Sequence, residues 1–160
     1  METILVLTDF SYNAFNAARY AVNLANQLHA AKVIIYHSFK LVPSDNPPPF
    51  ASEVEDLWSQ TVERLNELKS SLQFFTNENT SIETLTDQKS LQSAIEYINK
   101  EEKVGLVIMG SIGNNRLKGL FIGSNTRSLS DSCELPLLII SPDTRIERLE
   151  KAERSELACS

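Results

Sequence analysis

Five short apolar segments are spaced along the 160-residue chain, and each is short enough to be a single β-strand. Four of them are nearly continuous runs of Ile, Leu and Val, which are typical of strands buried on both faces of a parallel sheet. The third segment alternates apolar and polar residues instead, which predicts an edge strand with one wet face. The segments are TILVLT (3–8), KVIIYH (32–37), SIETLT (81–86), GLVIM (105–109) and PLLIIS (136–141).

Amphipathic patterns fill the intervals between these segments. Apolar residues recur at helical spacing within 13–28, 52–76 and 90–100, so each of these ranges predicts a helix. Ser90 is a suitable N-cap for the third helix. A fourth helix is expected to begin near Thr126 and to stop before Pro136. In the second helix, Leu57 and Trp58 are expected to lie in the core or on a dimer surface.

Strand and helix therefore alternate, which predicts an α/β fold with a parallel sheet and helices on both faces. Right-handed crossovers make such a fold doubly wound, and five strands favour the order 3-2-1-4-5. The winding then reverses between strands 1 and 4, and ligands of such folds bind at the carboxyl ends of the strands at that reversal. The expected site lies where strand 1 ends, at Leu7, Thr8 and Asp9, and where strand 4 ends, at Met109 and Gly110.

Composition narrows the class of protein. With 42% hydrophobic and 22% charged residues, the chain is expected to form one globular domain. Its net charge of −6 argues against a nucleic-acid partner, which requires clustered Lys and Arg. Cys133 and Cys159 lack metal-ligand spacing and suit a reducing cytoplasm. The start METILVLTDF does not resemble a secretory signal, and no apolar run approaches the roughly 20 residues of a membrane span, so no membrane partner is expected.

The segment MGSIGNNRLKGLFIGSNT (109–126) holds four of the five glycines of the chain. Gly110 is expected to let the chain turn sharply off strand 4, and Gly113 to leave room for a ligand to approach the backbone. Gly123 and Ser124 then open the last helix, whose free N–H groups and positive dipole end favour an anion. Asn125 and Thr126 follow in the first turn. This arrangement predicts a phosphate-binding loop.

The loop is neither a Walker A motif nor the dinucleotide-binding fingerprint G-x-G-x-x-G. The alternative is that its glycines serve only as turn residues. Two glycines three apart are weak evidence, but the full spacing G-x2-G-x9-G-S between a buried strand and a helix is much more specific.

This spacing resembles the signature motif of the universal stress protein family. Gly110, Gly113, Gly123 and Ser124 match that motif without a gap. ILVLTDFSYNAFNAARYAVNLA (4–25) is similar to the first strand and helix of that family, and ELPLLIIS (134–141) to its last strand. The resemblance covers about residues 2–142. It implies a nucleotide-binding domain over 1–142 with a fold of the adenine nucleotide alpha hydrolase-like type. It also implies ATP binding in the subset with this motif, and homodimers through the last strand.

The resemblance also assigns roles to single residues. Asp9 is expected to hold the ribose or adenine end of ATP, and the adenosine pocket is expected to be lined by Leu7, Thr8, Ser38 and Met109. Phosphates and ribose would be bound by Gly110, Gly113, Gly123, Ser124, Asn125 and Thr126. The chain departs from the family at Leu7, where proline is frequent, at Asn125, where valine is common, and at Lys89 and Ser90, which replace Gly-Asp.

Several side chains have two interpretations. Asp9 is either a ligand contact or the N-cap of a helix over 10–28. Arg116 and Lys118 either fold over phosphates or are solvated loop cations, and His37 is interpreted as structural. The proline-rich segment 39–52 either covers the rim of the site or only connects two elements. The charged tail, 143–160, is expected to be helical or frayed, or to begin a linker to a further domain.

The sequence shows no set of nucleophile, base and acid, and no metal-ligand cluster, so neither catalytic nor metal-binding residues are assigned. Mg²⁺ would enter with ATP, held by phosphates and water. The first hypothesis is an ATP-binding regulatory or stress-response protein located in the cytoplasm. The alternatives are a slow ATP hydrolase or adenylyl-transfer enzyme on the same fold, or a dimerisation module whose pocket is empty or binds another adenine compound.

Overall fold

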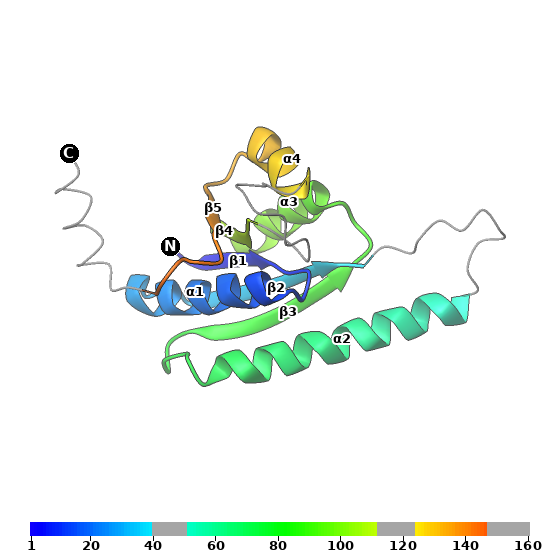
Figure 1. The fold of residues 1–160 in the computed structure, drawn as a ribbon, viewed down its shortest axis with the longest axis horizontal. Helices are drawn as coiled ribbons and strands as arrows, with labels where there is room; N and C mark the ends of the chain where they lie inside the picture. Colours follow the sequence, from blue (N-terminus) through cyan, green and yellow to red (C-terminus); the bar gives the residue numbers. More distant parts are fainter. Residues whose placement is uncertain (40–50, 112–123, 147–160) are drawn as a thin grey trace.

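The computed structural model describes residues 1–39, 51–111 and 124–146, and Figure 1 shows their fold. Five parallel strands form one sheet in the order β3-β2-β1-β4-β5. This order confirms the predicted topology, including the reversal of winding between β1 and β4. The strands are β1 (Thr3–Leu7), β2 (Lys32–Ser38), β3 (Ser81–Asp87), β4 (Val104–Gly110) and β5 (Leu137–Ile140).

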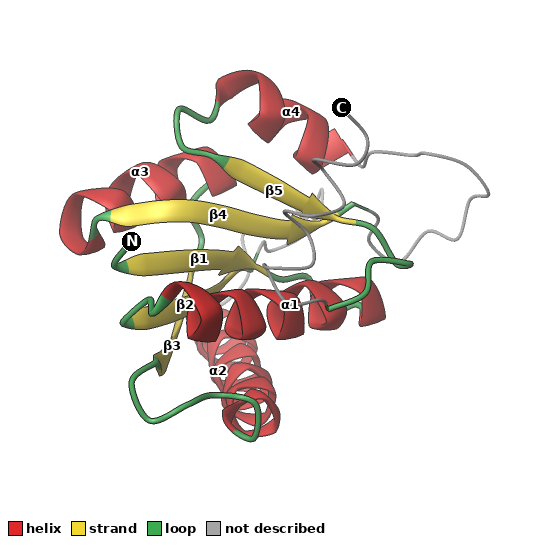
Figure 2. Ribbon diagram, turned by 90° about the vertical axis from the view of Figure 1, so that its left-hand side faces the viewer, coloured by secondary structure: helices red, strands yellow, loops and turns green. Residues whose placement is uncertain are grey.

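Helices cover both faces of the sheet, as Figure 2 shows. One face packs against α1 (Tyr12–Leu28) and α2 (Ala51–Gln73), and the other against α3 (Leu91–Glu102) and α4 (Ser124–Ser132). None of the helices within the described ranges is long and apolar enough to cross a membrane. The α/β class with helices on both faces is therefore confirmed.

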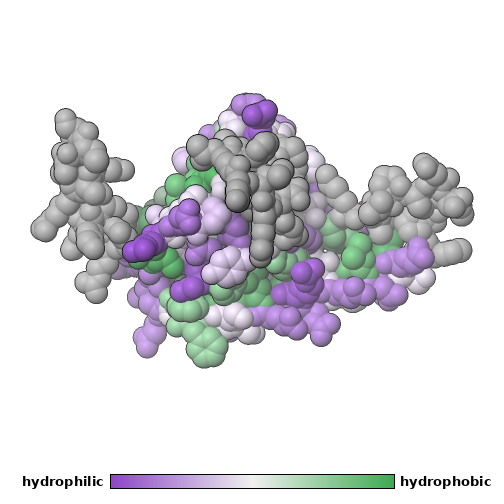
Figure 3. Space-filling model, in the orientation of Figure 1, coloured by the Kyte–Doolittle hydropathy of each residue, from purple (hydrophilic) through white to green (hydrophobic). Residues whose placement is uncertain are grey.

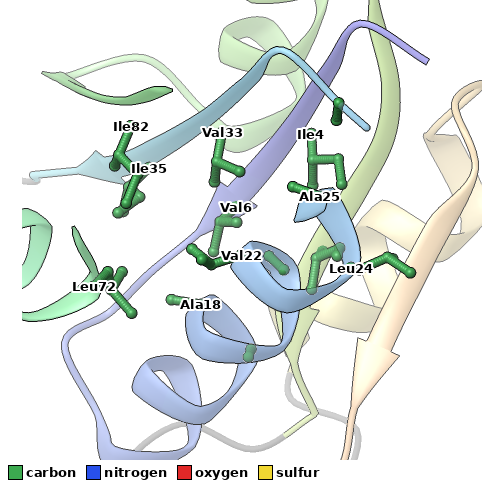
Figure 4. Packing of buried hydrophobic residues seen from close by; sticks show 14 of the residues in the cluster. Ile4, Val6, Ala18, Val22, Leu24, Ala25, Val33, Ile35, Leu72 and Ile82 are labelled. Carbon is green, nitrogen blue, oxygen red and sulfur yellow. The ribbon is translucent and has the colours of Figure 1, made fainter. Parts of the chain in front are cut away.

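The core between α1 and the sheet is built from branched strand residues and small helix residues (Figure 4). Ile4, Val6, Val33 and Ile35 are fully buried on the sheet side. The facing stripe of α1 includes Ala18, Val22 and Ala25, which are also fully buried. Alanine at these positions lets the helix axis approach the sheet closely, so β1 and α1 form one rigid unit that carries the loop between them.

The edge strand β3 has the alternation that its sequence predicts. Ile82 is buried, whereas its neighbours Ser81 and Glu83 are exposed. At the amino end of the sheet, Lys32 of β2 bridges the carboxylates of Glu83 and Glu102 at 3.0 and 2.9 Å. The hydrogen bond with Glu102, and then that with Glu83, raise the pKa of Lys32. This ion cluster lies at the opposite end of the sheet from the expected site.

The helix α2 is only partly buried, although its sequence predicts a continuous apolar stripe. Leu65 and Leu72 are buried against the sheet, but the side chain of Trp58 is 47% exposed, so this residue is not part of the core. Hydrophilic residues line much of the surface that α2 forms (Figure 3). Residues 147–160 of the predicted charged tail lie outside the described ranges, and 141–146 form a turn in which Thr144 N–H bonds the Ser141 carbonyl at 3.0 Å.

Candidate functional site

The carboxyl ends of β1 and β4 lie side by side at the point where the winding reverses. Val6 is paired with Ile108, so Leu7 and Met109 follow at the same level. Leu7 and Met109 are 4% and 8% exposed and pack with the cluster beneath α3 and α4. Two of the residues expected to line the adenosine pocket are therefore mostly core residues. Only a small part of the surface of each is accessible to a ligand.

The loop after β1 holds Asp9 at the surface by local hydrogen bonds. Thr8 Oγ1 accepts a bond from the Phe10 N–H at 3.1 Å, and Asp9 Oδ1 accepts one from the Ser11 N–H at 2.9 Å. Thr8 is buried, whereas Asp9 is exposed. The Asp9 carboxylate is thus oriented through one oxygen, and its exposure leaves the group accessible to a ligand.

Ser11, not Asp9, is the N-cap of α1. Its backbone is extended and its hydroxyl accepts a hydrogen bond from the Ala14 N–H at 3.1 Å. The interpretation of Asp9 as the N-cap of a helix over 10–28 is therefore wrong. The physical reason is that Phe10 intervenes in a left-handed conformation, which excludes it from the helix and moves the cap two residues along the chain.

Phe10 combines a bulky side chain with a φ of 62°. For a residue other than glycine this region is unfavourable by roughly 1–2 kcal/mol, so neighbouring contacts must hold it. The guanidinium carbon of Arg64, from α2, lies 4.1 Å from the centre of the Phe10 ring, and the His37 ring centre lies 4.6 Å away. A residue next to Asp9 is therefore in contact with both α2 and β2.

His37 ties the end of β2 to the same loop. Its Nδ1 lies 2.7 Å from the carbonyl oxygen of Thr8, and because a carbonyl only accepts, Nδ1 carries the proton of this bond. The contact with Phe10 and this hydrogen bond agree with the structural role predicted for His37.

Gly110 ends β4 beside the first turn of α1. A Cβ atom on Gly110 would lie 2.7 Å from Nδ2 and 3.2 Å from Cγ of Asn13, a residue that is 6% exposed. The sheet pairing continues through Gly110 to Ser111, whose N–H bonds the Ile140 carbonyl at 2.9 Å, and Gly110 has no left-handed φ. The chain bends at Ser111, the last described residue of this segment, so the expected turn off β4 stays a prediction, and glycine at 110 also allows close packing against α1.

Ser38 ends β2, and its hydroxyl donates to the Lys89 carbonyl at 2.6 Å. Nearby, the buried Tyr36 donates its hydroxyl to Asp87 Oδ1 at 2.6 Å, and the N–H and ammonium of Lys89 donate to the same carboxylate at 2.8 and 3.0 Å. Burial and then the bond to Asp87 raise the pKa of Tyr36. Burial acts to raise the pKa of Asp87, but hydrogen bonds from Tyr36 and Lys89 outweigh it and hold that pKa below 3.8.

Replacing Asp87 with asparagine is expected to lower the free energy of unfolding at pH 7 by about 1 kcal/mol, since charge-assisted hydrogen bonds are worth roughly 1.5–3 kcal/mol and partial exposure screens this one. Because the pKa of Asp87 is lower in the folded state, its contribution is complete above 3.8 and is lost as the pH falls through the folded value. Urea unfolding of both proteins at pH 7, 5 and 3 measures this. A difference that does not shrink at pH 3 contradicts the assignment.

The rest of the predicted glycine loop is only partly described. Gly113 and Gly123, and the cations Arg116 and Lys118, lie outside the described residues, as do the side chains of Ser124, Asn125 and Thr126. The helix α4 begins at Ser124, two residues before the predicted start. Figure 2 shows that it begins on the carboxyl side of the sheet and runs back toward the start of β5. Its first N–H groups therefore lie at the edge that carries Asp9 and Gly110.

Sequence reasoning missed the contacts that shape this edge, made by Phe10, Asn13, Arg64 and the pair Tyr36 and Asp87. A tyrosine within a buried strand needs a hydrogen-bond partner for its hydroxyl, so the sequence did indicate that Tyr36 has a polar partner such as Asp87. The left-handed Phe10 and the contact of Arg64 with its ring have no comparable signature, since both depend on how three elements meet.

The sequence profile described as "Universal stress protein family" matches residues 1–141. The chain belongs to the universal stress protein family. This agrees with the resemblance carried by the glycine spacing and with the observed strand order, which solved structures of the family share.

Individual proteins are similar to this chain at modest identity. A curated protein of Thermus aquaticus, "Universal stress protein in QAH/OAS sulfhydrylase 3'region", is 27% identical and covers 87% of this chain and 98% of its own. The structure of universal stress protein UspA from Lactobacillus plantarum has a TM-score of 0.71 at 21% identity over 87% and 97% of the chains. That of the universal stress protein from Archaeoglobus fulgidus in complex with dAMP has 0.59 at 18% over 88% and 98%.

Proposed function

We propose that this universal stress protein binds an adenine nucleotide, with ATP as the expected ligand, at the carboxyl ends of β1 and β4. The observation that carries the proposal is the exposed carboxylate of Asp9, held through one oxygen beside Gly110, where the winding of the sheet reverses. Carboxylates at such positions accept hydrogen bonds from ribose hydroxyls, and reversals of this kind are where α/β folds bind nucleotides.

The phosphate end of the ligand is assigned to the glycine loop and the start of α4. The spacing of Gly110, Gly113 and Gly123 supports this assignment, as does the start of α4 at Ser124 on the same edge of the sheet. Helix N-termini favour anions through their free N–H groups and dipole. The dAMP complex of the Archaeoglobus fulgidus protein supports an adenine nucleotide as the class of ligand. Mg²⁺ would be held by phosphates and water.

A binding role is favoured over rapid catalysis. The sequence places neither of its two histidines beside a candidate serine by any motif, and the observed contacts of His37, a hydrogen bond from Nδ1 to the Thr8 carbonyl and packing against Phe10, hold the loop after β1. We therefore propose a regulatory or stress-response protein of the cytoplasm. A slow ATP hydrolase, an adenylyl-transfer enzyme and a dimerisation module without ATP are the alternatives that the experiment below separates.

A homodimer through β5 is part of the proposal. This strand lies at the edge of the sheet, and three of its four apolar residues, Leu137, Leu138 and Ile139, are only half-buried in the single chain. An apolar edge of this kind is stabilised when it pairs with a second strand. Nucleotide bound one strand away, at the end of β4, would then be positioned to influence the dimer contact.

The proposal predicts that an adenine nucleotide remains with the purified protein or raises its melting temperature when added. A ligand at one hundred times its Kd stabilises the folded state by about 2.7 kcal/mol. Mass spectrometry of the denatured protein identifies retained ligand, and thermal unfolding with ATP, AMP and GTP measures selectivity. Absence of retained ligand together with an unchanged melting temperature in ATP contradicts the proposal. Steady ATP turnover would favour the enzymatic alternative.

A further inference from the structure

The conformation of Phe10 is maintained by residues that are distant in the sequence. Its φ of 62° lies in a region that bulky residues seldom adopt, and such outliers persist where the surrounding structure imposes them. The ring contacts the guanidinium of Arg64 at 4.1 Å and the imidazole of His37 at 4.6 Å. These contacts come from α2 and β2, so the loop after β1 takes its shape from two other elements.

The backbone of Phe10 also decides where the Asp9 carboxylate points. Phe10 lies between Asp9 and Ser11, and the hydrogen bond from the Ser11 N–H to Asp9 Oδ1 spans it. A change in φ at Phe10 moves the Ser11 N–H relative to Asp9 and releases the carboxylate oxygen that this bond holds. On the β2 side, the bond from His37 to the Thr8 carbonyl already fixes the preceding residue.

We propose that Arg64 is a positioning residue of the nucleotide site, which acts through the Phe10 ring to hold Asp9 in the orientation that binds the ligand. The inference rests on the proposed function for the identity of the ligand. Arg64 packs its cation on the ring of a residue whose backbone is strained and whose ring also contacts His37. This interaction favours arginine for its planar, weakly hydrated charge. Arg64 thereby links the position of α2 to the geometry of the site.

The chain offers a matched control. Arg19, on α1, lies with its guanidinium carbon 4.9 Å from the centre of the Phe75 ring, just beyond α2. Phe75 follows the carboxyl-terminal end of α2, where its carbonyl accepts a bond from Asn26 near the end of α1, at the opposite end of the sheet from Asp9. Arg19→Met therefore removes the same kind of contact without reaching the site.

The experiment compares Arg64→Met, Arg64→Lys and Arg19→Met by ATP titration in full-length protein. Arg64→Met is expected to raise the Kd for ATP about threefold, since exposed cation–π contacts are worth roughly two- to fivefold in an equilibrium constant. Arg64→Lys keeps a cation but loses the planar stacking group, so it is expected to restore only part of the affinity, and Arg19→Met is expected to leave the Kd unchanged. An unchanged Kd in Arg64→Met, or an equal loss in Arg19→Met, overturns the proposal.

A double-mutant cycle excludes direct contact of Arg64 with the ligand. Glycine adopts the φ of Phe10 without strain, so Phe10→Gly removes the ring while the loop still folds. If Arg64 acts through the ring, then adding Arg64→Met to Phe10→Gly leaves the Kd unchanged. A further threefold loss in the double variant indicates that Arg64 binds the ligand itself, and overturns the proposal.

A ligand-free measurement separates this inference from the proposed function. Amide resonances of Asp9 and Ser11 in the nucleotide-free protein are expected to shift in Arg64→Met and to stay in place in Arg19→Met. If the unmodified protein binds no nucleotide but these shifts appear, the proposed ligand is wrong and the positioning role of Arg64 holds. If the resonances of Asp9 and Ser11 do not move in Arg64→Met, the positioning role is wrong whatever the protein binds.

Discussion

Replacing Asp9 with asparagine is expected to weaken ATP binding at least about tenfold while the stability of the fold changes little, since a hydrogen bond to a charged group is worth roughly 1.5–3 kcal/mol. Asparagine keeps the oxygen that accepts the Ser11 N–H, so the loop is retained. In place of the second carboxylate oxygen, asparagine has an NH₂ group. This group donates a hydrogen bond, whereas a ribose hydroxyl or adenine amine of the ligand needs an acceptor there.

Two variants make this result specific to Asp9. Asp9→Ala removes both the bond to Ser11 and the ligand contact, so it is expected to lower stability as well as affinity. Asp131→Asn removes an exposed carboxylate from the last turn of α4, away from the carboxyl edge, and is expected to leave the Kd unchanged. Equal affinity of Asp9→Asn and the unmodified protein would mean that the ligand site lies elsewhere.

Replacing Gly110 with alanine is expected to lower the free energy of unfolding by about 2 kcal/mol, in the range of other overpacking substitutions. The added methyl group would meet Asn13 Nδ2 at 2.7 Å and Cγ at 3.2 Å, and this side chain is buried beneath the end of β4. Because α1 begins next to Asp9, the shift is also expected to weaken ATP binding. Urea unfolding measures the stability and titration the affinity.

Two further experiments test whether contact with Asn13 causes the loss of stability in Gly110→Ala. One is a double-mutant cycle with Asn13, and the other is the same substitution at a second glycine. In an Asn13→Ala background, Gly110→Ala is expected to cost much less, because the two side-chain atoms nearest to the new methyl group are gone and the backbone carbon of residue 13, at 3.4 Å, is an ordinary contact. The three atoms nearest to a Cβ at Gly105 all belong to the side chain of Met1, with Cγ at 2.6 Å, and Met1 is a 55% exposed terminal residue whose long side chain is expected to move aside. If Gly105→Ala proves as costly as Gly110→Ala, side-chain packing at Asn13 is not the reason for glycine at 110.

The order and class of the elements were predictable because each strand and helix has its own hydrophobic period. The alternation in 81–86 predicted an edge strand, and β3 occupies the edge of the sheet. Ser90, predicted as an N-cap, accepts the N–H of Ser93 at 3.2 Å. Both features depend on residues close together in the sequence, so local patterns suffice to predict them.

The details of the site depend on contacts between residues that are distant in the sequence. These details were predicted less well than the strands and helices. The cap of α1 lies at Ser11 rather than Asp9 because Phe10 is left-handed, and the ring of Phe10 contacts Arg64, more than fifty residues away. The need for glycine at 110 comes from Asn13 on another element. Neither of these two contacts between distant residues can be read from the residue types and their spacing in the sequence.

Titration of the isotope-labelled protein with ATP, followed residue by residue by NMR, tests the central claim most directly, because one experiment gives both the Kd and the location of the ligand. If ATP binds at the carboxyl ends of β1 and β4, the amides of Thr8, Asp9, Ser11 and Gly110 are expected to show saturable shifts, and Asp9→Asn is expected to raise the Kd at least about tenfold. Shifts that cluster instead between α3 and α4, or no saturable shifts at millimolar ATP, would contradict it.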